Sequence, residues 1–360
     1  MKKLFLSLVA AMMCATATFA QSSTLAVLSH EGQLSTFYGS GALKSALSAA
    51  NHGDVITLSS GTFDAADITK AVTIRGAGME TDTLTKTYPT RLLADFKIDV
   101  PDSLSHRLMI EGVYSDAAIS VCNTLKNATF QKCRFGGFTS IYGQTYGYGR
   151  MKNVTFLHCK IIRYFSNING SNTVLFVNCL VKNPRIGSDG YSNTFEFSNC
   201  MIWWDGGGAY TTPDNSYNGT YKNCIIFRQN LKNWGPDTYS LNRSNSIYNC
   251  LGVSSNITIL SKLFTNFADN AAGATFQTTS NIEGVFSDFQ GDYTDAVTFN
   301  LTDNAKTKYL GDDGKELGIY GGSLPFSSRV LSPQITKCNV AQKTTADGKL
   351  SVDMEVKGVE

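Results

Sequence analysis

Hydrophobic and polar positions between Leu125 and Val253 follow one short phrase that recurs six times and ends each time in a cysteine. An apolar residue stands three positions before every cysteine, and another usually stands two positions after it. The cysteines recur at a mean interval of about 23 residues, which is typical of stacked-repeat proteins. The pattern therefore predicts a solenoid built from the phrases 127–133, 153–159, 173–179, 194–200, 218–224 and 244–250.

The spacing within the phrase predicts a corner in each coil. Side chains of a strand alternate between its two faces, so two residues three positions apart face the same interior only if the chain bends between them. Asparagine tolerates the left-handed backbone of such a bend, and it directly precedes the cysteine at Asn178, Asn199, Asn223 and Asn249. Lys132 and His158 occupy this slot in two phrases, where we expect a strained or differently shaped corner.

Glycine takes the asparagine slot in three further segments, at Gly76, Gly112 and Gly321. Together with the six phrases they predict nine coils on one plan. Helical repeats are excluded because the apolar spacing is not the 3.6-residue period of a helix. We therefore predict an all-β chain, a single-stranded right-handed parallel β-helix.

The cysteines are predicted to form a buried thiol ladder instead of disulfides. Equivalent positions in adjacent coils lie about 4.8 Å apart with parallel Cβ vectors, whereas a disulfide needs Cβ atoms at about 3.8 Å. Six cysteines belong to the ladder, while Cys122 and Cys338 lie outside it. Buried thiols of this kind fill space as small apolar groups.

Residues 1–20 have the pattern of a secretory signal peptide, with Lys2 and Lys3, an apolar run and small residues before a cleavage point after Ala20. The expected location is secreted, periplasmic or on the cell surface. The remaining chain carries 29 basic and 29 acidic residues, and this balance argues against a nucleic-acid partner. No later stretch is long and apolar enough to predict a membrane span.

The β-helix domain is expected to cover residues 21–326, beginning with an unstructured lead-in over 21–40. The apolar spacing of 42–50 predicts a short helix that caps the open end of the coil. Residues 291–301 are predicted to form a strand, and 327–360 a β tail. The alternating segment 349–356 is expected to cover the edge of the last coil, since uncovered edges invite aggregation.

The opening segments, Gly53-Asp-Val-Ile-Thr-Leu-Ser-Ser-Gly-Thr-Phe63 and Ile68-Thr-Lys-Ala-Val-Thr-Ile-Arg-Gly-Ala-Gly78, closely resemble those of the pectin-lyase-like superfamily of right-handed parallel β-helices. Residues 312–326 resemble the closing segment of secreted β-helix proteins from Gram-negative gut bacteria. The resemblance covers roughly residues 42 to 322, and it implies a fold much more than an activity.

The motifs of the enzymes on this scaffold do not match the chain. Polygalacturonase-type hydrolases use clustered aspartates, whereas the only adjacent pair here is Asp312-Asp313. The Trp-Ile-Asp-His and Arg-x-Pro-x-x-Arg segments of pectate lyases are absent from the sequence. Pectate lyases bind calcium, which is therefore the metal to consider here, but the sequence has no cluster of acidic ligands that supports it. No other cofactor is evident. If the chain is catalytic, a lyase is favoured over a hydrolase.

A stripe of polar and aromatic residues is predicted where each coil leaves the strand after its cysteine. Arginine and lysine bind carboxylates and sulfates, and exposed tryptophan stacks on sugar faces. The candidate substrate-binding residues are Arg163, Tyr164, Lys182, Arg185, Asp189, Trp203, Trp204, Asp205 and Arg228. The alternative is structural, with a tryptophan packed at the corner and the arginines paired with neighbouring aspartates.

Two functions follow from this sequence. The first is binding, or lyase-like processing, of an acidic polysaccharide or cell-surface glycan. The second is a non-catalytic surface adhesin or structural β-helix protein. The sequence favours a carbohydrate partner without naming an acid and base for catalysis, and it does not indicate an oligomeric state.

Overall fold

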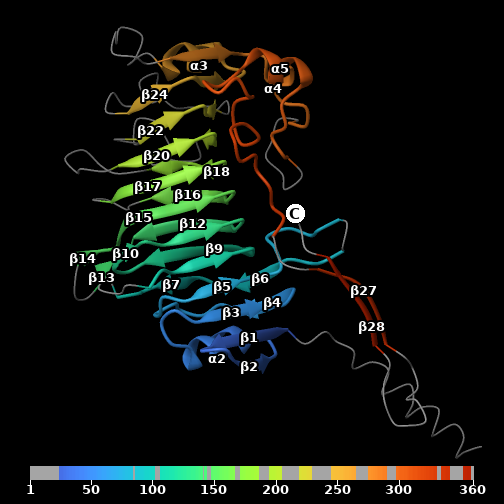
Figure 1. Ribbon diagram of the computed structural model, residues 1–360. Helices are drawn as coiled ribbons and strands as arrows, with labels where there is room; N and C mark the ends of the chain where they lie inside the picture. The colour runs from blue at the N-terminus through green and yellow to red at the C-terminus, as the bar shows by residue number, and fades with distance from the viewer. Residues whose placement is uncertain are drawn as a thin grey trace, which may run out of the picture.

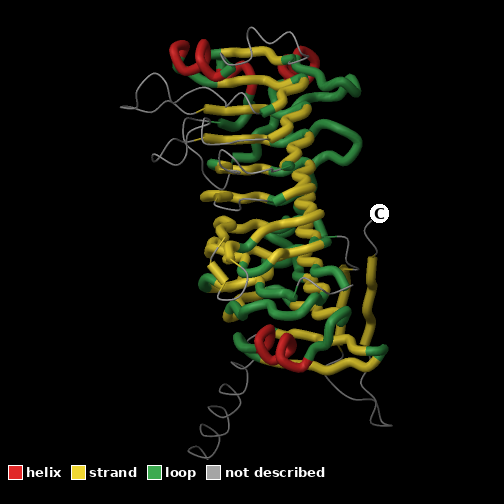
Figure 2. Tube along the Cα trace, turned by 90° about the vertical axis from the view of Figure 1, so that its left-hand side faces the viewer, coloured by secondary structure: helices red, strands yellow, loops and turns green. Residues whose placement is uncertain are grey.

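A computed structural model describes residues 24–83, 86–101, 106–140, 142–143, 147–166, 171–185, 194–204, 219–228, 245–264, 275–289, 297–330, 334–340 and 352–357. The chain is a β-solenoid in which two long sheets run side by side along one axis (Figure 1). Figure 2 shows the rungs edge-on, each rising directly above the one before. The predicted parallel β-helix is confirmed.

The first sheet has twelve strands. In spatial order they are β2 (Gln33–Tyr38), β1 (Leu25–His30), β3 (Val55–Leu58), β5 (Thr73–Arg75), β8 (Met109–Glu111), β11 (Thr129–Gln131), β15 (Arg150–Leu157), β17 (Asn172–Val177), β20 (Phe195–Ser198), β22 (Gly219–Lys222) and β24 (Ser246–Tyr248), with β10 (Thr124–Lys126) also paired to β15. Successive coils pair in parallel, whereas β1 pairs antiparallel with both β2 and β3.

The second sheet also has twelve strands. In order they are β26 (Phe276–Thr279), β25 (Cys250–Val253), β23 (Ile225–Arg228), β21 (Met201–Trp204), β18 (Leu180–Lys182), β16 (Lys160–Ser166), β12 (Arg134–Ser140), β9 (Val113–Val121), β6 (Thr90–Leu93) and β4 (Gly61–Asp64), with β19 (Pro184–Arg185) beside β16 and β7 (Phe96–Ile98) beside β9.

Short elements complete the described chain. They are the antiparallel pairs β13 (Tyr142–Gly143) with β14 (Gly147–Tyr148) and β27 (Gln334–Val340) with β28 (Val352–Lys357), and the helices α2 (Ala42–Ala49), α3 (Ile257–Leu263), α4 (Ile282–Val285) and α5 (Asp303–Lys308). Helix α2 lies at one end of the solenoid and α3 to α5 at the other (Figure 1). The capping helix predicted for 42–50 is therefore present.

The interior contains two continuous columns, one aromatic and one of thiols. The rings of Phe130, Phe156, Phe176, Phe197 and Tyr221 stack with centroids 4.6 to 4.9 Å apart and planes within 11° of parallel. All six cysteines of the repeat are buried and free. The predicted ladder is confirmed, and Cys122 is also buried and free.

The thiols also complete the hydrogen bonding of the corner. The Cys200 thiol donates to the carbonyl of Phe176 in the preceding coil at 3.4 Å and accepts the backbone N–H of Cys179 at 3.5 Å. Burial raises the pKa of the Cys200 thiol, which keeps the proton that it donates. A buried N–H without an acceptor is costly, so the thiol satisfies a backbone group that an alanine could not.

The corners are left-handed, as the asparagines predict. The residue before the cysteine has φ between 47° and 53° in all six phrases, at Lys132, His158, Asn178, Asn199, Asn223 and Asn249. Of the strained or differently shaped corner predicted at Lys132 and His158, the different shape is wrong, because their backbone matches that of the asparagines. Both residues nonetheless hold a left-handed conformation that is uncommon for their residue types. Gly112 shares the geometry at φ 65°. Gly76 does not have this left-handed backbone. A larger residue is excluded there because its Cβ would lie 2.3 Å from the carbonyl oxygen of Gly112.

The last predicted coil is instead a segment that crosses the outside of the stack. Residues 311–330, here called the strap, run from the α5 end of the solenoid down along the column of left-handed corners (Figure 1). Asn223 donates to Asp312 at 2.8 Å, Asn178 donates to the carbonyls of Ile319 and Gly321 at 2.7 and 2.8 Å, and His158 Nε2 lies 3.0 Å from the Leu324 carbonyl oxygen. The column that forms the corners therefore also binds the strap.

Three other expectations are corrected by the structure. Residues 25–38 of the supposed lead-in form the β1–β2 hairpin, which pairs with the first coil through β3. Of the strand predicted over 291–301, residues 291–296 lie outside the described residues, and 297–301 contain only an isolated bridge between Leu301 and Phe286. The tail strand exists as β28, but its partner is β27 and not the last coil.

Candidate functional site

One column on the outer face of the second sheet changes chemistry halfway along the solenoid. It consists of Arg91, Tyr114, Arg134, Lys160, Leu180, Met201, Ile225 and Leu251, which pair in register from strand to strand. The last four are apolar and belong to a second hydrophobic core that is closed by residues within 285–289 and 297–319. The first four, here called the polar ladder, are charged or aromatic.

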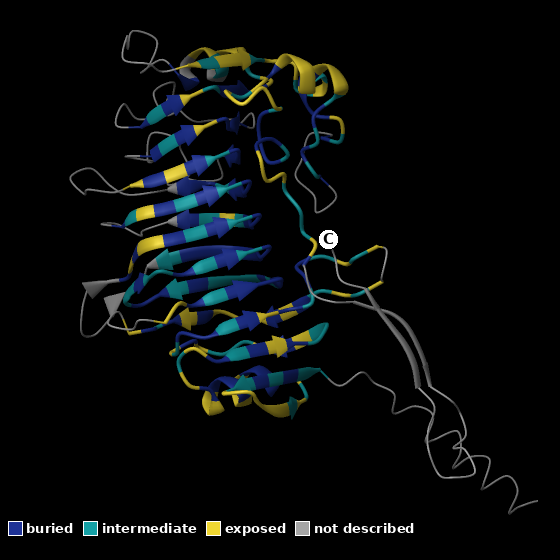
Figure 3. Cartoon of the chain, in the orientation of Figure 1, coloured by how far each residue is buried: buried dark blue, intermediate teal, exposed yellow. Residues whose placement is uncertain are grey.

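The covered half contains part of the predicted binding stripe. Trp203 is 1% exposed and packs on Phe227 and Phe299 within the second core. Trp204 is 0% exposed and lies inside the solenoid. Arg228, its partner in register, is also 0% exposed. These three residues therefore do not form the exposed surface that the sequence predicts. Figure 3 shows that buried residues occur in strands along the whole solenoid.

Of the other residues in the predicted binding stripe, the structure describes the side chains of Arg163, Tyr164 and Lys182. Arg163 is exposed and Tyr164 is half-buried. Both lie next to a shift of register in the pairing of β12 with β16. The Lys182 ammonium lies 4.5 Å from the centroid of the Trp203 ring. None of these three lines the groove described below. The Arg185 side chain, Asp189 and Asp205 lie outside the described residues.

The polar ladder places two guanidinium groups around one tyrosine. Those of Arg91 and Arg134 lie 5.0 and 4.8 Å from the centroid of the Tyr114 ring. Asp116 accepts from Arg134 at 3.2 Å and from the Tyr114 hydroxyl, and Arg91 lies 3.7 Å from the same carboxylate. Burial, followed by the bond to Asp116, raises the pKa of Tyr114, so this phenol stays protonated at neutral pH.

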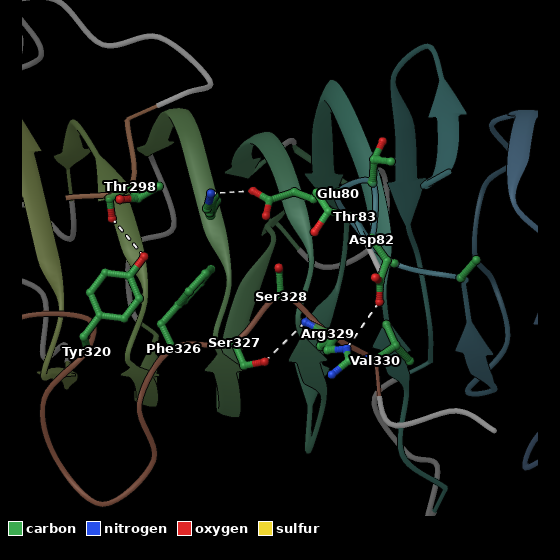
Figure 4. Close-up of a pocket in the computed structure, with 14 residues that line it drawn as sticks. Glu80, Asp82, Thr83, Thr298, Tyr320, Phe326, Ser327, Ser328, Arg329 and Val330 are labelled. Atoms are coloured by element: carbon green, nitrogen blue, oxygen red, sulfur yellow. Dashed lines mark hydrogen bonds and ion pairs between the residues drawn. The ribbon is translucent and has the colours of Figure 1, made fainter. Parts of the chain in front are cut away.

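A groove of about 330 Å³ lies where the polar ladder meets the covered half (Figure 4). Its walls are the connection after β5, residues 77–83, and the strap from Tyr320 to Val330, while Lys160 forms its floor. Lys160 is only 6% exposed and forms an ion pair with Glu80. Its ammonium lies 5.4 Å from the Phe326 ring centroid, so a charged and an aromatic group face the same space.

The remaining wall groups are hydroxyls and a second ion pair. Arg329 of the strap donates to Asp82 at 3.3 Å. Tyr320 donates to the Thr298 carbonyl at 3.1 Å, and burial raises its pKa to about 12, so it stays neutral. Figure 4 shows Ser327 and Ser328 between Phe326 and Arg329. Cations, an aromatic face and several hydroxyls are the groups that hold an anionic sugar.

Sequence reasoning missed this groove because its walls come from distant segments. Glu80, Lys160 and Phe326 are brought together only by the folded solenoid and its strap. One signal was nonetheless present: Lys160 and Arg134 directly follow their cysteines, where the later phrases have Leu180, Met201, Ile225 and Leu251.

The described part of the chain has no group of three or more His, Cys, Asp or Glu that could hold a metal ion. Within that same part, no helix has the length and apolar character needed to cross a membrane. A search of family models, curated proteins and solved structures found no match to the chain.

Proposed function

We propose that this protein acts outside the cytoplasm and binds an acidic polysaccharide, with one anionic sugar held in the groove above Lys160. The observation that carries the proposal is the buried Lys160 ammonium, which faces the groove at the end of the in-register polar ladder. An extracytoplasmic carbohydrate partner is supported by the signal-like residues 1–20 and by two resemblances: that of the opening segments to the pectin-lyase-like superfamily, and that of residues 312–326 to secreted β-helix proteins of Gram-negative gut bacteria.

The arrangement of cations suits a linear anionic polymer. Arg91, Arg134 and Lys160 are on successive or nearby rungs of one sheet, and adjacent rungs lie about 4.8 Å apart. A chain lying along the solenoid axis therefore meets cationic groups repeatedly. Phe326 supplies a face on which a sugar ring can stack, and the serine and threonine hydroxyls can bond its polar groups.

Binding is favoured over catalysis by the state of the acidic groups. Glu80, Asp82 and Asp116 each bond a cation, and Tyr114 keeps its proton. No pair of these groups is arranged as a free acid and base around the groove. We therefore propose a glycan-binding protein without assigning it a reaction.

The test is binding to polygalacturonate, a sulfated glycan and neutral dextran, measured by calorimetry at low and high salt. We expect binding to an anionic glycan that weakens with salt and does not occur with dextran. The variant Lys160→Met should weaken binding about tenfold or more, since charge-assisted hydrogen bonds contribute on the order of 1.5–3 kcal/mol. Lys152→Met is the matched control, because Lys152 is exposed on the first sheet. Absence of binding to every anionic glycan would reject the proposal.

A further inference from the structure

The connection after β5 reaches unusually far along the solenoid. It joins β5 to β6, but its Glu80 carboxylate pairs with Lys160 on β16, three strands beyond β6 in the second sheet. At about 4.8 Å per rung this is roughly 14 Å along the axis. The base of the connection is fixed by backbone bonds from Gly78 to Gly112 at 2.9 Å and from Thr90 to Gly78 at 3.0 Å. Its tip therefore lies lengthwise over the sheet, in the direction proposed for the glycan.

The tip carries the same chemical groups as an acidic sugar chain. Glu80-Thr81-Asp82-Thr83 alternates carboxylates with hydroxyls, and all four residues line the groove. Its two carboxylates engage cations from two different elements, Lys160 of β16 and Arg329 of the strap. Figure 4 shows Glu80 and Asp82 extending toward these partners from one side of the groove.

We infer that residues 80–83 are an internal mimic of the anionic ligand, a plug that occupies the cations of the groove until a polyanion displaces it. This inference rests on the proposed glycan binding at the same groove. Each ion pair has one partly exposed partner, since the Glu80 side chain is 35% and the Arg329 side chain 43% exposed, whereas the side chains of Lys160 and Asp82 are 8% and 14% exposed. A ligand can therefore approach each pair from its exposed side, and the less exposed Lys160 needs an anionic partner whichever one is present.

The plug also predicts a selectivity. A ligand with isolated charges replaces one carboxylate and leaves the other in place, whereas a polymer with charges on successive units replaces both Glu80 and Asp82. The favoured ligand is therefore a polyanion of at least two charged sugars. A single uronic acid should bind much more weakly than an oligomer.

The experiment compares the full chain with the double variant E80Q/D82N, using oligogalacturonates of one to six units as the probe. Removing the competing carboxylates should tighten oligomer binding at least fivefold, with a smaller change for the monomer. The matched control is E283Q/D303N, which changes net charge equally through two exposed residues away from the groove. This control should leave the affinity within twofold of wild type.

Hydrogen exchange of residues 79–83 supplies an independent readout. Ligand should accelerate exchange in this segment if the plug leaves, whereas slower exchange would mean that the segment closes over the ligand and would overturn the inference. Unchanged or weaker oligomer binding by E80Q/D82N, with the wild type still binding, would also overturn the plug alone. If neither protein binds any oligomer, both the plug and the proposed function fail.

Discussion

The two halves of the second sheet's outer face share one backbone register but have opposite chemistry. From Leu180 to Leu251 the column is apolar and covered by residues within 285–289 and 297–319. From Arg91 to Lys160 it is polar, and ends at the groove. Because one hydrophobic core runs inside the solenoid beneath both halves, the fold constrains the inner side of the sheet while the outer column is free to diverge. Stability should therefore concentrate in the covered half and recognition in the polar half.

The largest effect is expected from removing a side chain of the covered half. Trp203→Ala empties the space against Phe227 and Phe299 and should lower the free energy of unfolding by about 3–5 kcal/mol. The matched change in the polar half, Arg91→Ala, should cost less than about 1 kcal/mol because this side chain is 46% exposed. Urea denaturation of both variants measures the difference. Equal losses would show that the two halves are not divided in this way.

A second prediction asks whether the interior is uniform beneath both halves. Cys133→Ala lies under the polar half and Cys200→Ala under the covered half, and in both coils the thiol donates to a carbonyl of the preceding coil. Each change should cost about 1–3 kcal/mol, because a buried backbone group loses its partner. Similar losses in urea denaturation are expected. A loss in only one of the two would mean that the ladder contributes unevenly.

The smallest effect concerns His158, which lies at the boundary between the two halves beneath the strap. Burial lowers its pKa below the usual 6.5, and the neighbouring Lys132 lowers it further. Below that usual value the unfolded chain takes up a proton that the folded chain does not, so stability present above pH 6.5 is lost as the pH falls. The contribution of His30 has the opposite sign, because its bond to Asp54 raises its pKa. This contribution is present below pH 6.5 and is lost as the pH rises.

The variant His158→Asn separates the two histidines. Asparagine occupies the same corner in four other coils with the same φ, so the backbone should tolerate the change. The wild type should lose thermal stability between about pH 7.5 and about pH 5.5 more steeply than the variant, since the titration of histidine falls in this range. Parallel curves of thermal stability against pH for the two proteins would show that His158 does not contribute to the pH dependence of stability.

Local sequence was sufficient for the coil and insufficient for what surrounds it. The corner could be predicted because one residue, such as Asn178, must adopt a left-handed backbone, and the buried cysteines follow from strand alternation. The burial of Trp203 and Trp204 could not be predicted, because both faces of their strand are buried. The inner face packs inside the solenoid, and the outer face is covered by residues beyond 285. The groove could not be predicted for the same reason. Its walls depend on contacts such as Lys160 with Glu80, which are 80 residues apart.

The strap also changes how the molecule can come apart. In a repeat protein each unit contacts only its neighbours, so unfolding can spread inward from either end one unit at a time. Here a single segment, the strap, binds the coils from Lys132 to Asn223 through their own corner residues. These coils cannot peel away singly while it remains bound, and the middle of the rod should break as one cooperative block after this longitudinal tie is released.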